Sequence, residues 1–373
     1  MSVDAGASRD TFPWPTLPGR DYHDAGVFDA DRGRVFAASW VCVGRAEALP
    51  DPGSYIVPEV AGESVVVIRG DDGQVRAFAN ACRHRGTLLL EGEGSVKGAI
   101  KCPYHAWTYG FDGRLLGSPN VHREDGLDPE RMGLWPVPLA EWEGFLFVNV
   151  DGRAGDLAER ISSEPDSPLQ LARYAVGTLR VGARREYDVA ANWKIVVENY
   201  HECLHCPTVH PELVKIVPLY RRGEVEEDGQ ILGNSMGEGL TSFTATGTSS
   251  LPPLPGLDEI DVHTFYGVYL FPNLILNYHS ETVNAVTIEP LGPERTRVVS
   301  EFLFAEETVC APGFDPSEVV EFRDLVARQD WVVCERAQRG VRSRFYTNGW
   351  YPRQERWIAA FNERYLQARG PLA

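Results

Sequence analysis

Long apolar runs are missing from this sequence. No stretch approaches the roughly 18 consecutive apolar residues that a membrane-spanning helix requires. The first residues, Met1 to Pro18, include Asp4 and Asp10 together with prolines, and they contain no apolar core of the kind found in a secretory signal peptide. We therefore expect a protein that has no membrane partner.

Basic residues are scarce relative to acidic ones. The chain has 36 lysines and arginines against 53 aspartates and glutamates, which gives a formal net charge of −17. This charge opposes binding to nucleic acids and to anionic membranes. The 7 cysteines are few, odd in number and scattered, a usage that favours a reducing cytoplasm. With 373 residues, of which 43% are apolar, the chain is long enough for two folded domains.

The sequence also lacks the signatures of a nicotinamide-binding or ferredoxin domain. No G-x-G-x-x-G follows a predicted strand, and no C-x4-C-x2-C run of the plant ferredoxin type occurs. The chain therefore cannot take hydride from NAD(P)H by itself, and any redox chemistry needs a separate electron donor.

Two cysteines and two histidines stand in mixed pairs. Cys82 and His84 form the first pair, and Cys102 and His105 form the second, in the pattern C-x-H-x17-C-x2-H. A zinc finger normally has two cysteines in one pair and two histidines in the other, so a zinc ribbon would need an unusual arrangement here. A Rieske [2Fe–2S] cluster has two Cys ligands on one iron and two His ligands on the other. We predict that these four residues hold such a cluster.

Strand signals surround this motif. Residues 64–69 and 74–78 flank Gly70-Asp71-Asp72-Gly73 and predict a hairpin, residues 107–116 predict a second one, and residues 144–150 predict a buried strand. We expect an N-terminal segment, residues 1–39, that packs on the larger domain. A small all-β domain is expected over residues 40–152.

The remaining residues, 153–373, predict a larger α+β domain, an antiparallel sheet with helices in a helix-grip-like arrangement. Residues 193–205 favour a helix, and strand signals return between residues 262 and 304. A last helix is predicted from about Pro316 to Arg339, with Asp315 as its N-cap. Residues 223–256 are rich in Gly, Ser, Thr and Pro, which favours a functional or mobile loop.

A second constellation follows in the pattern E-x2-H-x4-H, formed by Glu202, His205 and His210. Glu202 and His205 are spaced to share one helix face, whereas His210 lies about 140° further round an ideal helix. Pro207 and Pro211 can stop the helix and bend the chain back. The two imidazoles and a carboxylate from elsewhere could then form the 2-His-1-carboxylate site of non-haem Fe(II) enzymes.

The third ligand should be a buried carboxylate, and the last helix offers Asp330 at the edge of its apolar stripe of Val319, Phe322, Val326, Val333 and Ala337. Pairing of Asp330 with Arg323 is an alternative. His201 is an alternative ligand beside His205. Cys203 and Cys206 are expected to be small packing residues rather than a redox pair or extra ligands.

The segment from Cys82 to Gly113 resembles the Rieske segment of ring-hydroxylating, Rieske-type non-haem iron oxygenases, with His84-Arg85-Gly86, Cys102-Pro103-Tyr104-His105 and Tyr109-Gly110-Phe111-Asp112-Gly113 as the matching runs. Residues 198–207 and the run Phe271-Pro272-Asn273-Leu274 resemble the subgroup that oxidises carnitine, glycine betaine, stachydrine and choline. The resemblance also points to Asp330, because residues 329–335 look like the segment that carries the third iron ligand.

Further expectations follow from this resemblance. The chain would be the large (alpha) subunit, with a Rieske [2Fe–2S] cluster and a mononuclear Fe(II). Glu202 would be the acid that links a cluster histidine of one subunit to an iron-ligand histidine of the next, in a homotrimer. An NAD(P)H-dependent flavin/iron–sulfur reductase or a ferredoxin would supply electrons, and a small molecule and O2 would be the substrates.

Three functions remain open at this point. The first is hydroxylation next to a quaternary nitrogen, with N-demethylation or C–N cleavage, for which an aromatic cage is expected. The candidates for that cage are Tyr266, Tyr269, Phe271, Tyr278 and Trp331. The second is an arene hydroxylase or O-demethylase of the same architecture. The third is a Rieske electron carrier without oxygenase activity, which the second constellation argues against.

Overall fold

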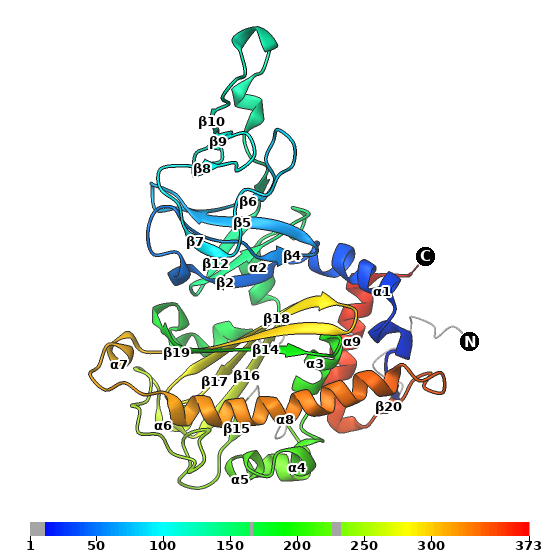
Figure 1. Ribbon diagram of the computed structural model, residues 1–373. Helices are drawn as coiled ribbons and strands as arrows, with labels where there is room; N and C mark the ends of the chain where they lie inside the picture. Colours follow the sequence, from blue (N-terminus) through cyan, green and yellow to red (C-terminus); the bar gives the residue numbers. More distant parts are fainter. Residues whose placement is uncertain (1–11, 165–166, 226–232, 373) are drawn as a thin grey trace. The chain divides into compact units, whose positions relative to one another are not determined.

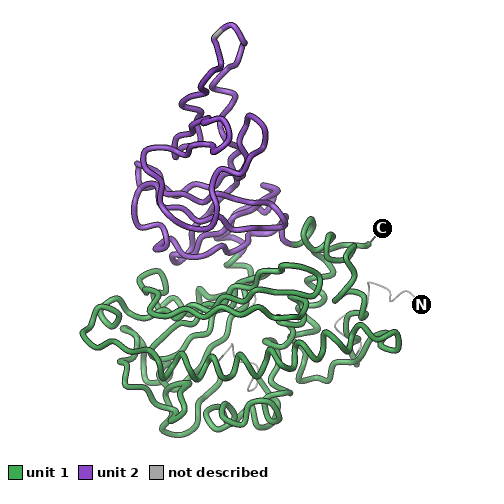
Figure 2. The backbone as a smooth tube through the Cα atoms, in the orientation of Figure 1, with its two compact units in different colours: residues 1–35, 161–373 green, residues 36–160 purple. Residues whose placement is uncertain are grey.

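The computed structural model describes residues 12–164, 167–225 and 233–372, which divide into two compact units (Figure 1 and Figure 2). Unit 2 comprises residues 36–160. Unit 1 takes its described residues from 1–35 and 161–373, so the start of the chain folds with its end. Strand β1 (Trp14–Pro15) pairs antiparallel with β20 (Trp350–Tyr351), and this pairing holds the N-terminal segment on unit 1.

Unit 2 is built from short antiparallel strands in three sheets. The first sheet has the order β11-β6-β5-β3-β7 with β4 beside β5, the second is β10-β9-β8, and the third is β12-β13-β2. The strands are β2 (Val41–Arg45), β3 (Ser54–Ile56), β4 (Glu59–Val60), β5 (Glu63–Arg69), β6 (Val75–Ala79), β7 (Glu93–Ser95), β8 (Ile100–Lys101), β9 (Thr108–Tyr109), β10 (Leu115–Gly117), β11 (Pro136–Val137), β12 (Leu139–Trp142) and β13 (Phe145–Val148).

The two predicted hairpins of this unit are confirmed. β5 pairs with β6 across the Asp-Gly turn, and β9 pairs with β10. Gly113, between β9 and β10, has a φ of +83°, and a Cβ there would lie 2.4 Å from the ring of Phe78. Only glycine accommodates both the left-handed backbone and this close approach. The predicted strand at residues 144–150 is the buried β13.

Unit 1 contains a six-stranded antiparallel sheet in the order β14-β19-β18-β17-β16-β15. Its strands are β14 (Arg180–Val189), β15 (Gly233–Ser235), β16 (Thr264–Leu270), β17 (Leu274–Tyr278), β18 (Val283–Gly292) and β19 (Arg295–Phe304). The predicted fold class, a small all-β domain plus a larger α+β domain, is confirmed.

Helices cover this sheet, and α8 is by far the longest of those in the described residues (Figure 1). It packs against α3 and contacts β14. Over both units, the α-helices of the described residues are α1 (Ala25–Ala30), α2 (Leu157–Ser162), α3 (Trp193–Tyr200), α4 (Cys206–Val209), α5 (Leu213–Ile216), α6 (Glu259–Val262), α7 (Glu306–Val309), α8 (Ser317–Val341) and α9 (Arg356–Arg369). Among the described residues, no helix combines the length and apolarity needed to cross a bilayer.

A buried ionic cluster joins the end of α1 to α3 and α9. Lys194 and Asp31 are both 0% exposed and form an ion pair, and Asp31 also accepts hydrogen bonds from Trp193 Nε1 at 3.1 Å and from Tyr365 Oη at 2.8 Å. Two charges removed from water are tolerated because each has close polar partners. The cluster holds the N-terminal end of α3, the helix that precedes Glu202, His205 and His210.

Two helix predictions need correction. The helix expected over residues 193–205 ends at Tyr200, and the chain turns through residues 201–205 before the short α4 begins. The last helix is capped by Pro316 rather than Asp315, which instead accepts a hydrogen bond from Ser317 N at 3.0 Å, and it continues through Gly340. The predicted apolar stripe also drifts, because Cys334 and Gln338 are buried in the last turns in place of Val333 and Ala337.

Candidate iron centres

Two loops of unit 2 present the predicted cluster ligands, and the loops have the same backbone design. The amide of Cys82 donates to Thr87 O at 2.9 Å, and the amide of Cys102 donates to Trp107 O at 2.8 Å, five residues on in each case. The residue four after each cysteine, Gly86 or Ala106, has a positive φ of 70° or 56° and donates back to the cysteine carbonyl. Each loop therefore closes tightly around its cysteine.

The two cysteine side chains lie inside and the two histidine side chains lie outside. Cys82 and Cys102 are each 2% exposed, whereas His84 and His105 lie at the surface with their ring centroids 4.6 Å apart. A single zinc ion would need all four donors around one point. An inner sulfur pair and an outer imidazole pair suit the two unlike ends of a Rieske cluster. Tyr109 Oη also lies 3.3 Å from Cys82 Sγ, where a hydrogen bond to sulfur would tune a cluster.

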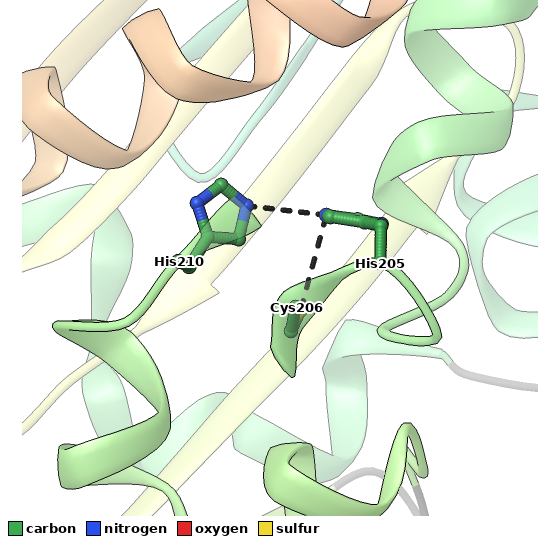
Figure 3. Close-up of side chains that lie close together, drawn as sticks. All are labelled: His205, Cys206 and His210. Atoms are coloured by element: carbon green, nitrogen blue, oxygen red, sulfur yellow. Dashed lines mark hydrogen bonds between the residues drawn. The ribbon is translucent and has the colours of Figure 1, made fainter. Parts of the chain in front are cut away.

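In unit 1, His205, His210 and Asp330 converge on one point. His205 Nε2 lies 3.1 Å from His210 Nε2, and Asp330 Oδ1 lies 3.2 Å from the first nitrogen and 2.9 Å from the second. The two histidines flank the two ends of α4, and their Nε2 atoms point toward each other (Figure 3). Asp330 reaches them from α8, 120 residues further along the chain.

The electrostatics of this cluster favour a cation. Burial opposes protonation of His205, but the carboxylates of Asp330 and Glu202 outweigh it and raise the pKa of the imidazole to about 10. Burial alone would raise the pKa of Asp330, and the two histidines lower it. The two carboxylates therefore favour a positive charge between the imidazoles. A bound divalent metal ion would supply that charge in place of a proton on His205. The donor set of two nitrogens and one carboxylate fits Fe(II).

A second layer of hydrogen bonds orients the two imidazoles. His210 Nδ1 lies 2.7 Å from Gln329 Oε1, and Gln329 Nε2 donates to Glu212 Oε2 at 3.1 Å. This arrangement directs Nε2 of His210 at the common point, as outer partners of metal-bound histidines usually do. Neither Gln329 nor Glu212 is among the residues that the sequence pattern singled out, although Gln329 precedes Asp330 directly.

Glu202 holds the other histidine. Its Oε1 contacts His205 Nδ1, and its Oε2 accepts a hydrogen bond from the backbone amide of His205 at 3.2 Å. The expectation that Glu202 and His205 share a helix face is wrong, because both lie in the turn after α3. The turn brings them into contact nevertheless. Glu202 is 10% exposed, so part of its carboxylate remains accessible.

Three alternatives left open by the sequence concern His201 as a ligand, Arg323 as a partner of Asp330, and the role of Cys203 and Cys206. His201 Nδ1 lies 2.7 Å from Val197 O, and the ring of His201 packs against Tyr269 and Phe361. No ion pair joins Arg323 to Asp330 among the described residues. Cys203 and Cys206, expected to be separate packing residues, are joined in a disulfide inside a buried apolar cluster. Cys206 Sγ lies 3.8 Å from His205 Nε2.

A cavity of about 220 Å³ opens onto the convergence point, a size suited to a small molecule. Of the five predicted cage residues, Tyr269 and Trp331 line it. Tyr266, Phe271 and Tyr278 do not. The side chain of Tyr266 donates to Asp261 at 2.9 Å, Tyr278 packs on Tyr174, and Phe271 lies under Arg364. Further aromatic residues in the lining are Tyr187, Tyr200, Tyr220, Phe243, Phe265 and Trp357.

Comparison with known proteins accounts for both centres. Residues 39–139 match the Rieske [2Fe-2S] domain, and residues 176–369 match the catalytic domain of the ring hydroxylating alpha subunit. The chain belongs to the Rieske-type ring-hydroxylating oxygenases. It is therefore the oxygenase component of a Rieske non-haem iron enzyme, with a [2Fe–2S] domain and a catalytic domain of the kind that binds a mononuclear iron.

Similar oxygenases are known from several bacteria. The carnitine monooxygenase oxygenase subunit of Escherichia coli strain K12 is 33% identical over 334 residues, which cover 89% of this chain and 85% of that protein. The glycine betaine monooxygenase oxygenase subunit of Chromohalobacter salexigens is 30% identical, with 91% and 82% covered.

Solved structures agree with this placement. The quaternary ammonium Rieske monooxygenase CntA in complex with its substrate gamma-butyrobetaine has a TM-score of 0.76 at 29% identity, with 96% of each chain covered. The naphthalene 1,2-dioxygenase from Rhodococcus, 22% identical with a TM-score of 0.77, covers 95% of this chain and 94% of that one and shares the fold.

Proposed function

We propose that this oxygenase hydroxylates a C–H bond next to the quaternary nitrogen of a small trimethylammonium compound. The convergence of His205, His210 and Asp330 on the floor of an aromatic-lined cavity carries the proposal. The names of similar relatives, the carnitine and glycine betaine monooxygenase oxygenase subunits, support the substrate class.

The reaction balances with one dioxygen and two electrons. One oxygen atom enters the C–H bond, and the other leaves as water with two protons. Hydroxylation of an N-methyl group then releases formaldehyde, whereas hydroxylation of the chain carbon breaks the C–N bond and releases trimethylamine. The electrons come from a separate NAD(P)H-dependent flavin/iron–sulfur reductase or ferredoxin, because the sequence has no nicotinamide-binding motif of the G-x-G-x-x-G type.

Each chain supplies the groups for this chemistry. Cys82 and Cys102 would hold the inner iron of the Rieske cluster, and His84 and His105 the outer one. When bound, the mononuclear iron activates O2 in the cavity. His205, His210 and Asp330 would hold this iron, and a donor set of two histidines and one carboxylate leaves it able to bind O2.

Glu202 would hold His205 in position and receive the approach of a cluster histidine from a neighbouring subunit. Together with the family resemblance, this assignment supports a homotrimer in which each cluster serves the neighbour's iron. The cationic end of the substrate would lie against aromatic rings such as Trp331 and Tyr187, whose centroids are 5.6 Å apart beside Asp330.

An oxygen-uptake assay with a surrogate reductase tests the proposal. Carnitine, gamma-butyrobetaine, glycine betaine, choline and simple arenes are offered separately, and formaldehyde and trimethylamine are quantified. We expect coupled O2 uptake with at least one trimethylammonium compound and none with His205→Ala, whose cluster spectrum should be unchanged. Turnover of arenes alone would refute the substrate class, and product formation by His205→Ala would refute the assignment of the iron site.

A further inference from the structure

Arg323 is a cation in the substrate cavity, and no acidic side chain of the described residues forms an ion pair with it. It lies on α8 and lines the cavity, and its Nη2 makes one long hydrogen bond, of 3.4 Å, to Asn284 Oδ1. No carboxylate of the described residues lies within ion-pair distance of it. A guanidinium carries five N–H donors, and leaving them unpaired in a sheltered site is costly.

The carboxylate of Asp330 attracts Arg323 from beyond ion-pair distance, but it is already engaged by His205 and His210. The ring of Phe243 lies 5.7 Å from the Cζ of Arg323, and Tyr200 and Tyr220 also line the cavity. His279, packed behind Phe243, is neutral, because burial and the charge of Arg323 hold its pKa well below the ordinary value. The cavity therefore presents a net positive charge at this end.

The position of Arg323 relative to the iron site is fixed by the helix. Arg323 and Asp330 both line the cavity from α8 and are seven residues apart. Two helical turns separate them by about 10 Å along the axis and leave them on nearly the same face. A ligand that spans the cavity could thus place one end at the iron and the other at the guanidinium.

The acceptor that faces Arg323 is held in orientation. The side-chain amide of Asn284 donates from Nδ2 to Ser300 Oγ at 2.8 Å and to Glu301 O at 3.0 Å, which leaves its Oδ1 to face the guanidinium. Tyr200 Oη, in the same lining, donates to Asn277 Oδ1 at 3.2 Å. These contacts preorganise a polar end in an otherwise largely aromatic cavity.

We propose that Arg323 binds a carboxylate of the substrate, so that the substrate is a zwitterion with its quaternary nitrogen near the iron and its carboxylate at the far end of the cavity. This inference rests on the proposed function and narrows it to betaine-type acids. A purely cationic alcohol such as choline would be repelled by Arg323, and an arene would leave the guanidinium unpaired. Charge-assisted hydrogen bonds of this kind contribute roughly 1.5–3 kcal/mol, which corresponds to about a 10- to 150-fold effect on binding.

A pair of matched substrates tests the role of Arg323. Gamma-butyrobetaine and the amide in which its carboxylate is replaced by an uncharged carboxamide have the same length and the same trimethylammonium group. We expect the wild-type enzyme to favour the acid by at least about 10-fold in kcat/KM. Arg323→Gln should lower kcat/KM for the acid by about 10- to 100-fold and leave the amide within about 3-fold. Arg323→Lys keeps the positive charge, so its kcat/KM for the acid should lie between those of the wild type and Arg323→Gln.

Arg328→Gln serves as the control, because Arg328 lies on the same helix with its side chain 68% exposed. Iron content and the cluster spectrum show whether each variant folds. Equal use of acid and amide by the wild type would overturn the inference while leaving the proposed function intact. So would an equal loss on both substrates in Arg323→Gln or, if that variant does not fold, in Arg323→Lys. A wild-type enzyme inert towards every trimethylammonium compound would instead refute the proposed function itself.

Discussion

The substitution Glu202→Gln should leave the Rieske cluster able to hold an electron but slow the transfer of that electron to the mononuclear iron site. The two carboxylate oxygens of Glu202 contact both Nδ1 and the backbone amide of His205. A glutamine has one oxygen, so it can satisfy only one of these donors and places an NH2 group opposite the other. The lost hydrogen bond is worth about 1–3 kcal/mol, and changes to outer partners of a metal-bound histidine typically cost about 10- to 100-fold in activity or metal affinity.

A single-turnover experiment measures this effect. The variant is loaded with iron, its Rieske cluster is reduced without oxygen, and O2 and substrate are then added together. The rate of cluster reoxidation is followed by absorbance and compared with the product formed. We expect a normal cluster spectrum, retained mononuclear iron, and reoxidation at least about 10-fold slower than in the wild type.

Glu321→Gln is the matched control, because Glu321 is exposed on α8 and should show wild-type kinetics. Reoxidation of the Glu202→Gln cluster at the wild-type rate, with full product yield, would refute the bridging role. Loss of the cluster itself would also contradict the reasoning, because Glu202 belongs to unit 1 and the cluster ligands to unit 2.

Three further predictions concern the iron site and the fold around it. Asp330→Ala should keep the cluster spectrum but lose mononuclear iron, as measured by metal analysis and turnover; a full iron complement would exclude Asp330 as a ligand. Asp31→Ala leaves Lys194, which is 0% exposed, without its ion-pair partner, and should lower the free energy of unfolding by roughly 3–5 kcal/mol in chemical denaturation; a change under about 1 kcal/mol would contradict this. Burial raises the pKa of Glu198 from 4.5 to about 7. The folded chain then binds the proton more tightly than the unfolded chain, so this contribution to stability is complete below about pH 4.5 and is lost as the pH rises through about 7. The melting temperature of Glu198→Gln should therefore fall less than that of the wild type between about pH 5.5 and pH 8, and parallel curves would show that Glu198 does not titrate in this range.

The sequence by itself determined the parts of this protein that depend on local chain geometry. The spacing of Cys82, His84, Cys102 and His105 predicts two short loops, each with one ligand of either kind, and the Asp-Gly turns predict the hairpins next to them. A turn or a tight loop is specified by residues a few positions apart, so its signal is present in the sequence. The same holds for the E-x2-H-x4-H run, whose members contact one another within α4 and the turn before it.

Only the tertiary structure decided which residues face the cavity. The strands β16 and β17 are buried on both faces, so their sequences show no polar alternation that would mark one face. Tyr266 and Tyr278 are paired across the two strands and do not line the cavity, whereas the Asn277 side chain and the Gly267 backbone, one position along, do line it. A shift of one residue along a strand moves every side chain to the opposite face of the sheet. The sequence of a fully buried strand therefore cannot show which residues line the cavity.

The sequence offered Asp330 as a candidate ligand, but only the tertiary structure brings it and Gln329 to the histidines. Asp330 and Gln329 reach the two histidines from a helix more than a hundred residues away, and the packing of α8 on α3 and β14 brings them there. The same packing places Arg323 in the cavity, although the sequence suggested it only as a partner for Asp330. Long-range contacts of this kind depend on how elements pack, because the residues that meet share no local backbone constraint.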